Sequence, residues 1–322
     1  MKKVSVILFS LSLFFGGFLT PEVRAQQDPQ YTQYMYNPLT INPAYAGTRG
    51  TLSLVGLHRT QWAGLDGAPT TFSISGHSPV GSSERVGLGF NLVRDEIFIT
   101  NETHIDIDFS YTIPTSDIGK LSFGLKGGAH LLDINYSQAS AFQDGDIYAT
   151  NQADIDNRFS PQVGVGLFYY TDRAYLGLSV PNLLQTEHFE ASDNSNLTTG
   201  NQTFLAEERM HFYLTAGKVF PLGSDLKFKP ATMVKVVQGA PLQVDLTANF
   251  LLYEKLTLGA AYRWSAAISG LIGFQLSDNI MLGFAYDSET TELRQYNDGS
   301  YEFFLRFEVF KNTKKILSPR FF

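Results

Sequence analysis

The stretch 239–287 reads GAPLQVDLTANFLLYEKLTLGAAYRWSAAISGLIGFQLSDNIMLGFAYD, and it decides the fold class of the chain. Over 242–250, apolar residues alternate strictly with Gln, Asp, Thr and Asn, and a similar alternation returns over 256–264. Period-two alternation is typical of a β-strand with one apolar and one polar face. The interruptions between the repeats are of hairpin length. The stretch therefore predicts an antiparallel meander, which needs either a second layer or closure on itself.

The connections between strands decide between these two solutions. Fourteen strand patterns lie between residues 51 and 311, most of them about 9 to 13 residues long, which is enough for a tilted strand to cross a bilayer. Long connections, at 134–160, 182–208 and 288–300, alternate with short ones. Outer-membrane barrels show this asymmetry between periplasmic turns and extracellular loops. We therefore predict an all-β fold, a closed antiparallel transmembrane β-barrel of about 14 strands over residues 51–311, with both the N- and C-termini in the periplasm.

The same alternation predicts which side chains face lipid. An ionised Asp245 in contact with hydrocarbon would be costly, and a shift of one residue would turn every side chain of the strand around. We therefore expect an outward set and an inward set over 242–250. The outward set is Leu242, Val244, Leu246 and Phe250, and the inward set is Gln243, Asp245, Thr247 and Asn249.

The N-terminus has the features of a secretory signal peptide over residues 1–25. Two lysines precede the apolar run 4–19, and Val23-Arg24-Ala25 is a possible cleavage site. Removal of this segment takes the net charge from −7 to −9, which argues against nucleic-acid binding. The chain has no cysteine, so disulfides and cysteine metal sites are excluded. No later apolar run is long enough for a transmembrane helix.

The segments on either side of the predicted barrel carry no strand pattern. Residues 26–50, QQDPQYTQYMYNPLTINPAYAGTRG, contain two Asn-Pro turn signals and several tyrosines. We expect a periplasmic N-terminal segment that packs against the barrel opening as a plug or a cap. Residues 312–322 form a C-terminal tail with basic residues. Either Phe310 or Phe322 could supply the aromatic end of a barrel-insertion signal.

Several motifs resemble the PorP/SprF family of type IX secretion system outer-membrane proteins. The resemblance covers the chain after the signal peptide. It rests on QYTQYMYNPLTINPAYAG at 30–47, QWAGLDGAPTTFSISGHSPV at 61–80, LSFGLKGG at 121–128, YLGLSVPNLL at 175–184, RMHFYLTAGKVF at 209–220, KPATMVKVVQGAPLQVDLTANFLLYEKLTLGAAYRW at 229–264 and GFAYD at 283–287.

This resemblance implies protein secretion in gliding and other Bacteroidetes-type bacteria. The implied partners are a secreted adhesin-like cargo with a C-terminal targeting domain, a periplasmic secretion-ring lipoprotein and a peptidoglycan-binding linker protein. The implied location is the outer membrane. A porin or small-solute channel is the alternative, and an open lumen with measurable conductance would favour it. An outer-membrane enzyme is a third possibility.

No catalytic or metal-binding motif stands out in the sequence. The six histidines form neither HExxH nor a pair at ligand spacing, and His104 with Asp106 on one strand face is best explained by a lumen hydrogen-bond network. Acidic residues in 134–160 are similar to a calcium loop but lack the EF-hand glutamate. We therefore expect no enzyme activity, no cofactor and no metal, and an acidic solvated loop in place of a calcium site.

The partner-binding candidates lie in the outer connections and in the N-terminal segment. Trp62 and Leu65 are apolar residues in the first outer connection, where they could anchor cargo or pack on the barrel rim. The set of expected partner-binding residues is Trp62, Leu65, Asp66, Tyr34, Tyr36, Tyr45, Asp144, Asp146 and Phe189.

Overall fold

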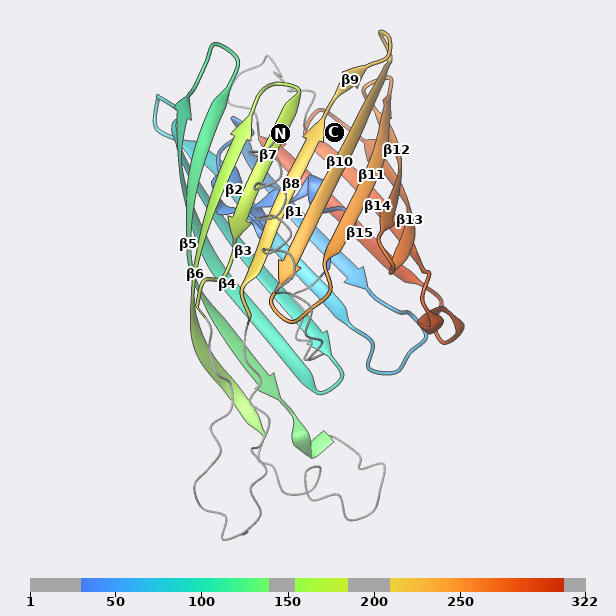
Figure 1. Cartoon of the computed structure of the whole chain (residues 1–322). Coiled ribbons are helices and arrows are strands. Elements are labelled where there is room, and N and C mark those ends of the chain that lie inside the picture. The colour runs from blue at the N-terminus through green and yellow to red at the C-terminus, as the bar shows by residue number, and fades with distance from the viewer. Residues whose placement is uncertain (1–29, 139–153, 185–208, 310–322) are drawn as a thin grey trace, which may run out of the picture.

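One antiparallel sheet closes on itself because β15 (Ser300–Val309) pairs with β1 (Leu52–Thr60) (Figure 1). The computed structural model describes residues 30–138, 154–184 and 209–309. The closing register runs from Leu52 opposite Val309 to Thr60 opposite Tyr301. The other strands are β2 (Thr70–Val80), β3 (Val86–Ile97), β4 (Thr100–Pro114), β5 (Lys120–Ile134), β6 (Ile155–Tyr170), β7 (Ala174–Val180), β8 (His211–Lys218), β9 (Phe220–Pro221), β10 (Leu226–Val237), β11 (Gln243–Leu252), β12 (Leu256–Arg263), β13 (Ala267–Gln275) and β14 (Ile280–Glu289).

The barrel has 14 strands, because β8 and β9 are two parts of one strand. Both pair with β10, and the break between them is the single residue Val219. On its other edge β10 pairs with β11, so the ring is continuous. The prediction of a closed 14-stranded antiparallel β-barrel is confirmed, and the predicted meander of residues 239–287 forms four neighbouring strands of its wall.

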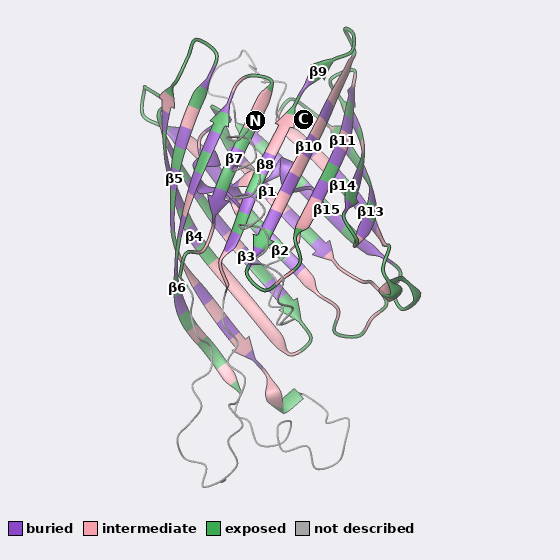
Figure 2. Cartoon of the chain, viewed as in Figure 1, coloured by how far each residue is buried: buried purple, intermediate pink, exposed green. Residues whose placement is uncertain are grey.

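The two faces of the wall differ as the alternation predicts (Figure 2). In β4, Ile105, Ile107 and Phe109 are exposed on the outside, whereas Asp106 and Asp108 are buried in the lumen. The same holds in β11, where Leu246 and Phe250 face out and Asp245, Thr247 and Asn249 face in. Since most large exposed apolar side chains belong to the strands, the outside of the barrel is suited to hydrocarbon.

The two ends of the barrel carry different connections. The short-turn end has the connections 81–85, 115–119, 171–173, 222–225, 253–255 and 276–279, none longer than five residues. The long-connection end has 61–69, 98–99, 135–154, 181–210, 238–242, 264–266 and 290–299. β1 begins and β15 ends at the short-turn end.

Residues 30–50, which we call the plug, lie inside the barrel (Figure 1). They form three short 3₁₀ turns, η1 (Tyr34–Tyr36), η2 (Pro38–Thr40) and η3 (Pro43–Tyr45). Asn42 precedes Pro43 in an extended conformation, and its side chain accepts a hydrogen bond from the backbone N–H of Ala44 at 3.0 Å. Among the described residues, no helix is long and apolar enough to span a membrane.

Candidate functional site

The lumen is filled by contacts between the plug and the inner faces of the strands. One apolar cluster joins Tyr34, Met35 and Tyr36 to residues of β1, β8, β10, β12, β13, β14 and β15. The ring of Tyr36 stacks on Phe304 with centroids 4.8 Å apart. A second cluster packs Leu39, Ala44, Tyr45 and Ala46 against aromatic residues of β6 and β7. The plug therefore contacts strands around most of the barrel circumference.

Three buried charged side chains hold the start of the plug, and we call Arg59, Asp287 and Glu302 the charged clamp. Arg59 lies 2.8 Å from Asp287 and 3.2 Å from Glu302. Glu302 accepts hydrogen bonds from the backbone N–H groups of Thr32 and Gln33 at 2.9 and 2.8 Å, and the Thr32 hydroxyl donates to Asp287 at 2.6 Å. Since all three charged residues are about 1% exposed, this network is shielded from bulk solvent.

The end of the plug is held by a second set of polar contacts. Arg49 donates to Glu308 at 2.6 Å, and both side chains are almost fully buried. The Ser110 hydroxyl donates to the Ala46 carbonyl at 2.7 Å, and the Gly47 N–H donates to Nδ1 of His77 at 3.0 Å. Backbone groups of the plug that would otherwise be unsatisfied in the lumen are thus bound by the wall.

One glycine of the wall is required by the close approach of the plug. A Cβ atom added at Gly124 in β5 would lie 2.1 Å from the backbone nitrogen of Ala44. Gly124 therefore gives η3 the space to lie directly on the strand backbone.

A cavity of about 70 Å³, lined by both polar and apolar side chains, remains between the plug and the long-connection end. Its lining includes Tyr31, His104, Lys126, Gln162 and His211. This volume holds only a few water molecules. This cavity is therefore too small to hold a polypeptide.

His104 and Asp106 do not interact as a catalytic pair. Asp106 lies 2.9 Å from the ammonium group of Lys126, whereas Nδ1 of His104 lies 3.2 Å from the amide oxygen of Gln162. Each of the two side chains therefore has a polar partner from another strand.

The connection 61–69 at the long-connection end is tied to the barrel rim. The indole N–H of Trp62 donates to Glu289 at 2.9 Å, and its backbone N–H donates to the Ser300 hydroxyl at 3.1 Å. Ala63 exchanges backbone hydrogen bonds with the connection 290–299. Leu65 is half-buried and Asp66 is exposed. The structure therefore shows this loop packed on the barrel rim, which is one of the two interpretations of its apolar residues.

The other expected partner-binding residues are not gathered at one surface. Tyr34, Tyr36 and Tyr45 are buried in the lumen, so a partner can contact them only if the plug moves. Asp144, Asp146 and Phe189 lie outside the described residues, as do Phe310 and Phe322.

One acidic residue of the predicted calcium-like segment is held within the loop base. Asp154 accepts hydrogen bonds from the backbone N–H and the hydroxyl of Ser137, each at 2.8 Å. These bonds lower the pKa of the Asp154 carboxyl, because they favour its charged form.

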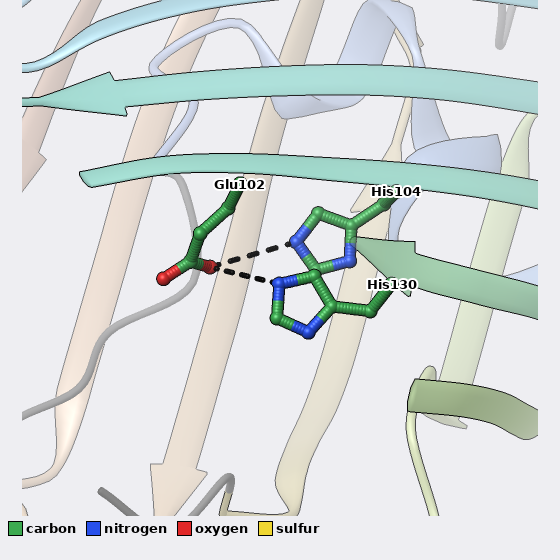
Figure 3. Close-up of side chains that lie close together, drawn as sticks. All are labelled: Glu102, His104 and His130. Carbon is green, nitrogen blue, oxygen red and sulfur yellow. Dashed lines mark ion pairs between the residues drawn. The ribbon is translucent and has the colours of Figure 1, made fainter. Parts of the chain in front are cut away.

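Sequence reasoning missed the charged clamp and a second group near the long-connection end, formed by Glu102, His104 and His130 (Figure 3). Both depend on which residues stand opposite each other in neighbouring strands. His104 faces His130 directly in the β4–β5 register. Aligning the predicted strands as hairpins, rather than searching for local motifs, could have found this pair.

Comparisons with known proteins agree with this architecture. The family model for the type IX secretion system membrane protein PorP/SprF matches residues 23–307. The monoaromatic hydrocarbon channel CymD is a similar solved structure, with a TM-score of 0.50 and 12% identity over 87% of this chain and 93% of that one. The Acinetobacter baumannii outer membrane protein Omp33 has a TM-score of 0.48 and 8% identity over 82% of this chain and 100% of that one. No curated protein matches the chain. The extent of the family match shows that this chain belongs to the PorP/SprF family of type IX secretion system membrane proteins.

Proposed function

We propose that this outer-membrane barrel binds a secreted adhesin-like cargo through the cargo's C-terminal targeting domain and helps to export it or anchor it at the cell surface. The observation that carries the proposal is the filled lumen. A barrel whose interior is bound to its own N-terminal segment is better suited to hold a partner at its rim than to pass one through. Family membership supports the link to type IX secretion.

The proposed orientation places the long-connection end outside the cell. Short periplasmic turns and long extracellular loops are usual in outer-membrane barrels. In this orientation β1 begins and β15 ends on the periplasmic side, where the cleaved signal peptide would leave the start of the mature chain. The short-turn end would then face the secretion-ring lipoprotein and the peptidoglycan-binding linker protein.

We further propose that cargo contacts the part of the rim that carries 135–154 and 181–210. The neighbouring connections 98–99 and 238–242, and the connection 264–266 further around the ring, are short, so they offer little surface. The protein would act by binding and not by catalysis. The lack of interaction between His104 and Asp106 supports this view.

A small-solute channel is the second candidate, and the barrel fold alone is compatible with it. The plug argues against it, because it packs against strands around the described lumen through two apolar clusters. A channel would require the plug to leave.

The test is affinity purification of the full-length protein from outer membranes of its native host, followed by identification of the proteins that co-purify. The proposal predicts an adhesin with a C-terminal targeting domain together with secretion-ring components. A matched purification of a variant lacking 185–208 should lose the adhesin and keep the ring components. Recovery of neither class with the full-length protein would contradict the proposal.

A further inference from the structure

Two histidines and one glutamate meet in the lumen close to the long-connection end (Figure 3). Glu102 and His104 lie near the start of β4, and His130 lies four residues before the end of β5, close to the connection 135–154. The imidazole rings are stacked with centroids 4.4 Å apart and an angle of 5° between their planes. Both rings approach the same carboxylate oxygen of Glu102 (Figure 3).

The separations of the donor atoms suit one small metal ion. Oε2 of Glu102 lies 3.5 Å from Nε2 of His130 and 3.8 Å from Nε2 of His104, and one ligand atom from each residue lies within 4.8 Å of the others. With metal–ligand bonds of about 2.1 Å, two ligand atoms of a tetrahedral zinc site lie about 3.4 Å apart. An imidazole nitrogen binds a metal in the plane of its ring, so the two parallel rings must rotate out of their stack before both nitrogens face one ion.

Gln162 is the hydrogen-bond partner of the other ring nitrogen of His104. Nδ1 of His104 lies 3.2 Å from Oε1 and 3.0 Å from Nε2 of Gln162, so the amide can accept a proton from Nδ1 or donate one to it. When Oε1 accepts the proton of Nδ1, the lone pair of the ring is left on Nε2, the nitrogen that lies 3.8 Å from Glu102. Hydrogen bonds from the other ring nitrogen to a protein oxygen are the usual way in which metal-binding histidines are oriented.

An ion can reach this group from the lumen. The side chains of Glu102 and His104 are 23% and 15% exposed, and that of His130 is 1% exposed. His104 and Gln162 also line the cavity of about 70 Å³ below the long-connection end. The arrangement therefore combines one buried ligand with two accessible ones.

We infer that Glu102, His104 and His130 form a binding site for a divalent transition metal ion of the zinc type. Two imidazoles and one carboxylate favour zinc and its neighbours over calcium or magnesium, which prefer oxygen ligands. Three protein ligands leave a fourth position for water or for a side chain of a bound partner. The ion would cross-link β4 to β5 directly below the connection 135–154.

The test uses the full-length protein without a histidine tag, purified in detergent and treated with a chelator. Zinc binding is measured by calorimetry, and cobalt(II) is used as a spectroscopic probe of tetrahedral coordination. The variants are Glu102→Gln, His104→Gln and His130→Gln. The control is His58→Gln, which removes an exposed histidine of β1 that lies outside the group.

The inference predicts one zinc ion per chain in the wild-type protein and in the His58→Gln control. Each of the three ligand variants should weaken binding by at least about tenfold. Calcium in excess should not displace the zinc. Heat-dependent gel migration reports whether each variant is a folded barrel, and Glu102→Gln, which is isosteric, decides the test if His130→Gln fails to fold. Absence of saturable binding in the wild-type protein, or wild-type affinity in any folded ligand variant, would overturn the inference.

Discussion

The guanidinium group of Arg59 on β1 lies 2.8 Å from a carboxylate oxygen of Asp287 on β14, across the intervening strand β15. Glu302 on β15 completes the charged clamp and binds the backbone of Thr32 and Gln33 in the plug. The clamp therefore joins the strands around the closing seam of the barrel to a segment that precedes the first strand. It links closure of the barrel to placement of the plug.

Replacement of Arg59 by methionine should destabilise the protein strongly. The change leaves two carboxylates buried side by side without their cation, and breaking a buried ion pair in this way costs about 3–5 kcal/mol. We expect a loss of that size in the free energy of unfolding, measured by denaturant titration in detergent, and faster proteolysis of the plug.

The matched control for this substitution is Arg94→Met. Arg94 pairs with Glu96 at 2.7 Å, but both side chains are about half exposed. Exposed pairs contribute about 0–1 kcal/mol, so the control should unfold nearly as the wild-type protein does. Equal effects of the two substitutions would refute the structural role of the clamp.

A valine at position 124 should prevent the plug from seating. The added Cβ atom alone would lie 2.1 Å from the backbone nitrogen of Ala44, and the backbone of β5 cannot move far within the sheet. We expect Gly124→Val to reduce the yield of folded barrel or to release the plug. Gly127→Val on the outer face of the same strand is the control, since a Cβ atom there meets nothing within 4 Å. If Gly124→Val and Gly127→Val gave the same folded yield and the same protease sensitivity, the close contact between the plug and β5 would be contradicted.

Most of the barrel wall could be predicted from the sequence, because strand alternation and connection length are local properties of the chain. The predicted outward and inward faces of 242–250 agree with the structure for this reason. The clamp could not be predicted in the same way, since Arg59 and Asp287 are far apart in sequence and meet only after the barrel closes. The contact between His104 and His130 likewise could not be predicted from local motifs, because it depends on the register of β4 against β5.

The position of the plug shows a different limit of sequence reasoning. The tyrosines and Asn-Pro turns of residues 30–50 indicate an ordered segment, but they do not say whether it lies within the barrel or across its opening. The decision depends on strand residues such as Phe304 and Gly124, whose contacts with the plug arise only in the folded protein.

The plugged lumen predicts low ion conductance. In planar bilayers the wild-type protein should show no stable open channel, since plug side chains and strand side chains fill the described lumen. A variant lacking residues 30–47 should conduct if it still folds. Steady conductance of the wild-type protein at the level of that deletion variant would instead favour the channel function.

The proposed orientation can be tested by chemical labelling, because the chain contains no cysteine of its own. Asp66 is exposed at the long-connection end and Asp117 is exposed at the short-turn end. On intact cells, a membrane-impermeant maleimide should label Asp66→Cys and not Asp117→Cys, whereas both should react after lysis. Labelling of only Asp117→Cys on intact cells would reverse the orientation.

The most direct test of the central claim compares cargo recovery with barrel assembly when the long connections are shortened. Residues 139–153 and 185–208 are each replaced by a short Gly-Ser linker, and the turn 115–119 at the opposite end is replaced in the same way as a control. We predict that both long-connection variants assemble in the outer membrane at wild-type level but recover much less adhesin-like cargo, while the control recovers the wild-type amount. Undiminished cargo recovery by both long-connection variants, or equal loss of cargo in the control, would contradict it.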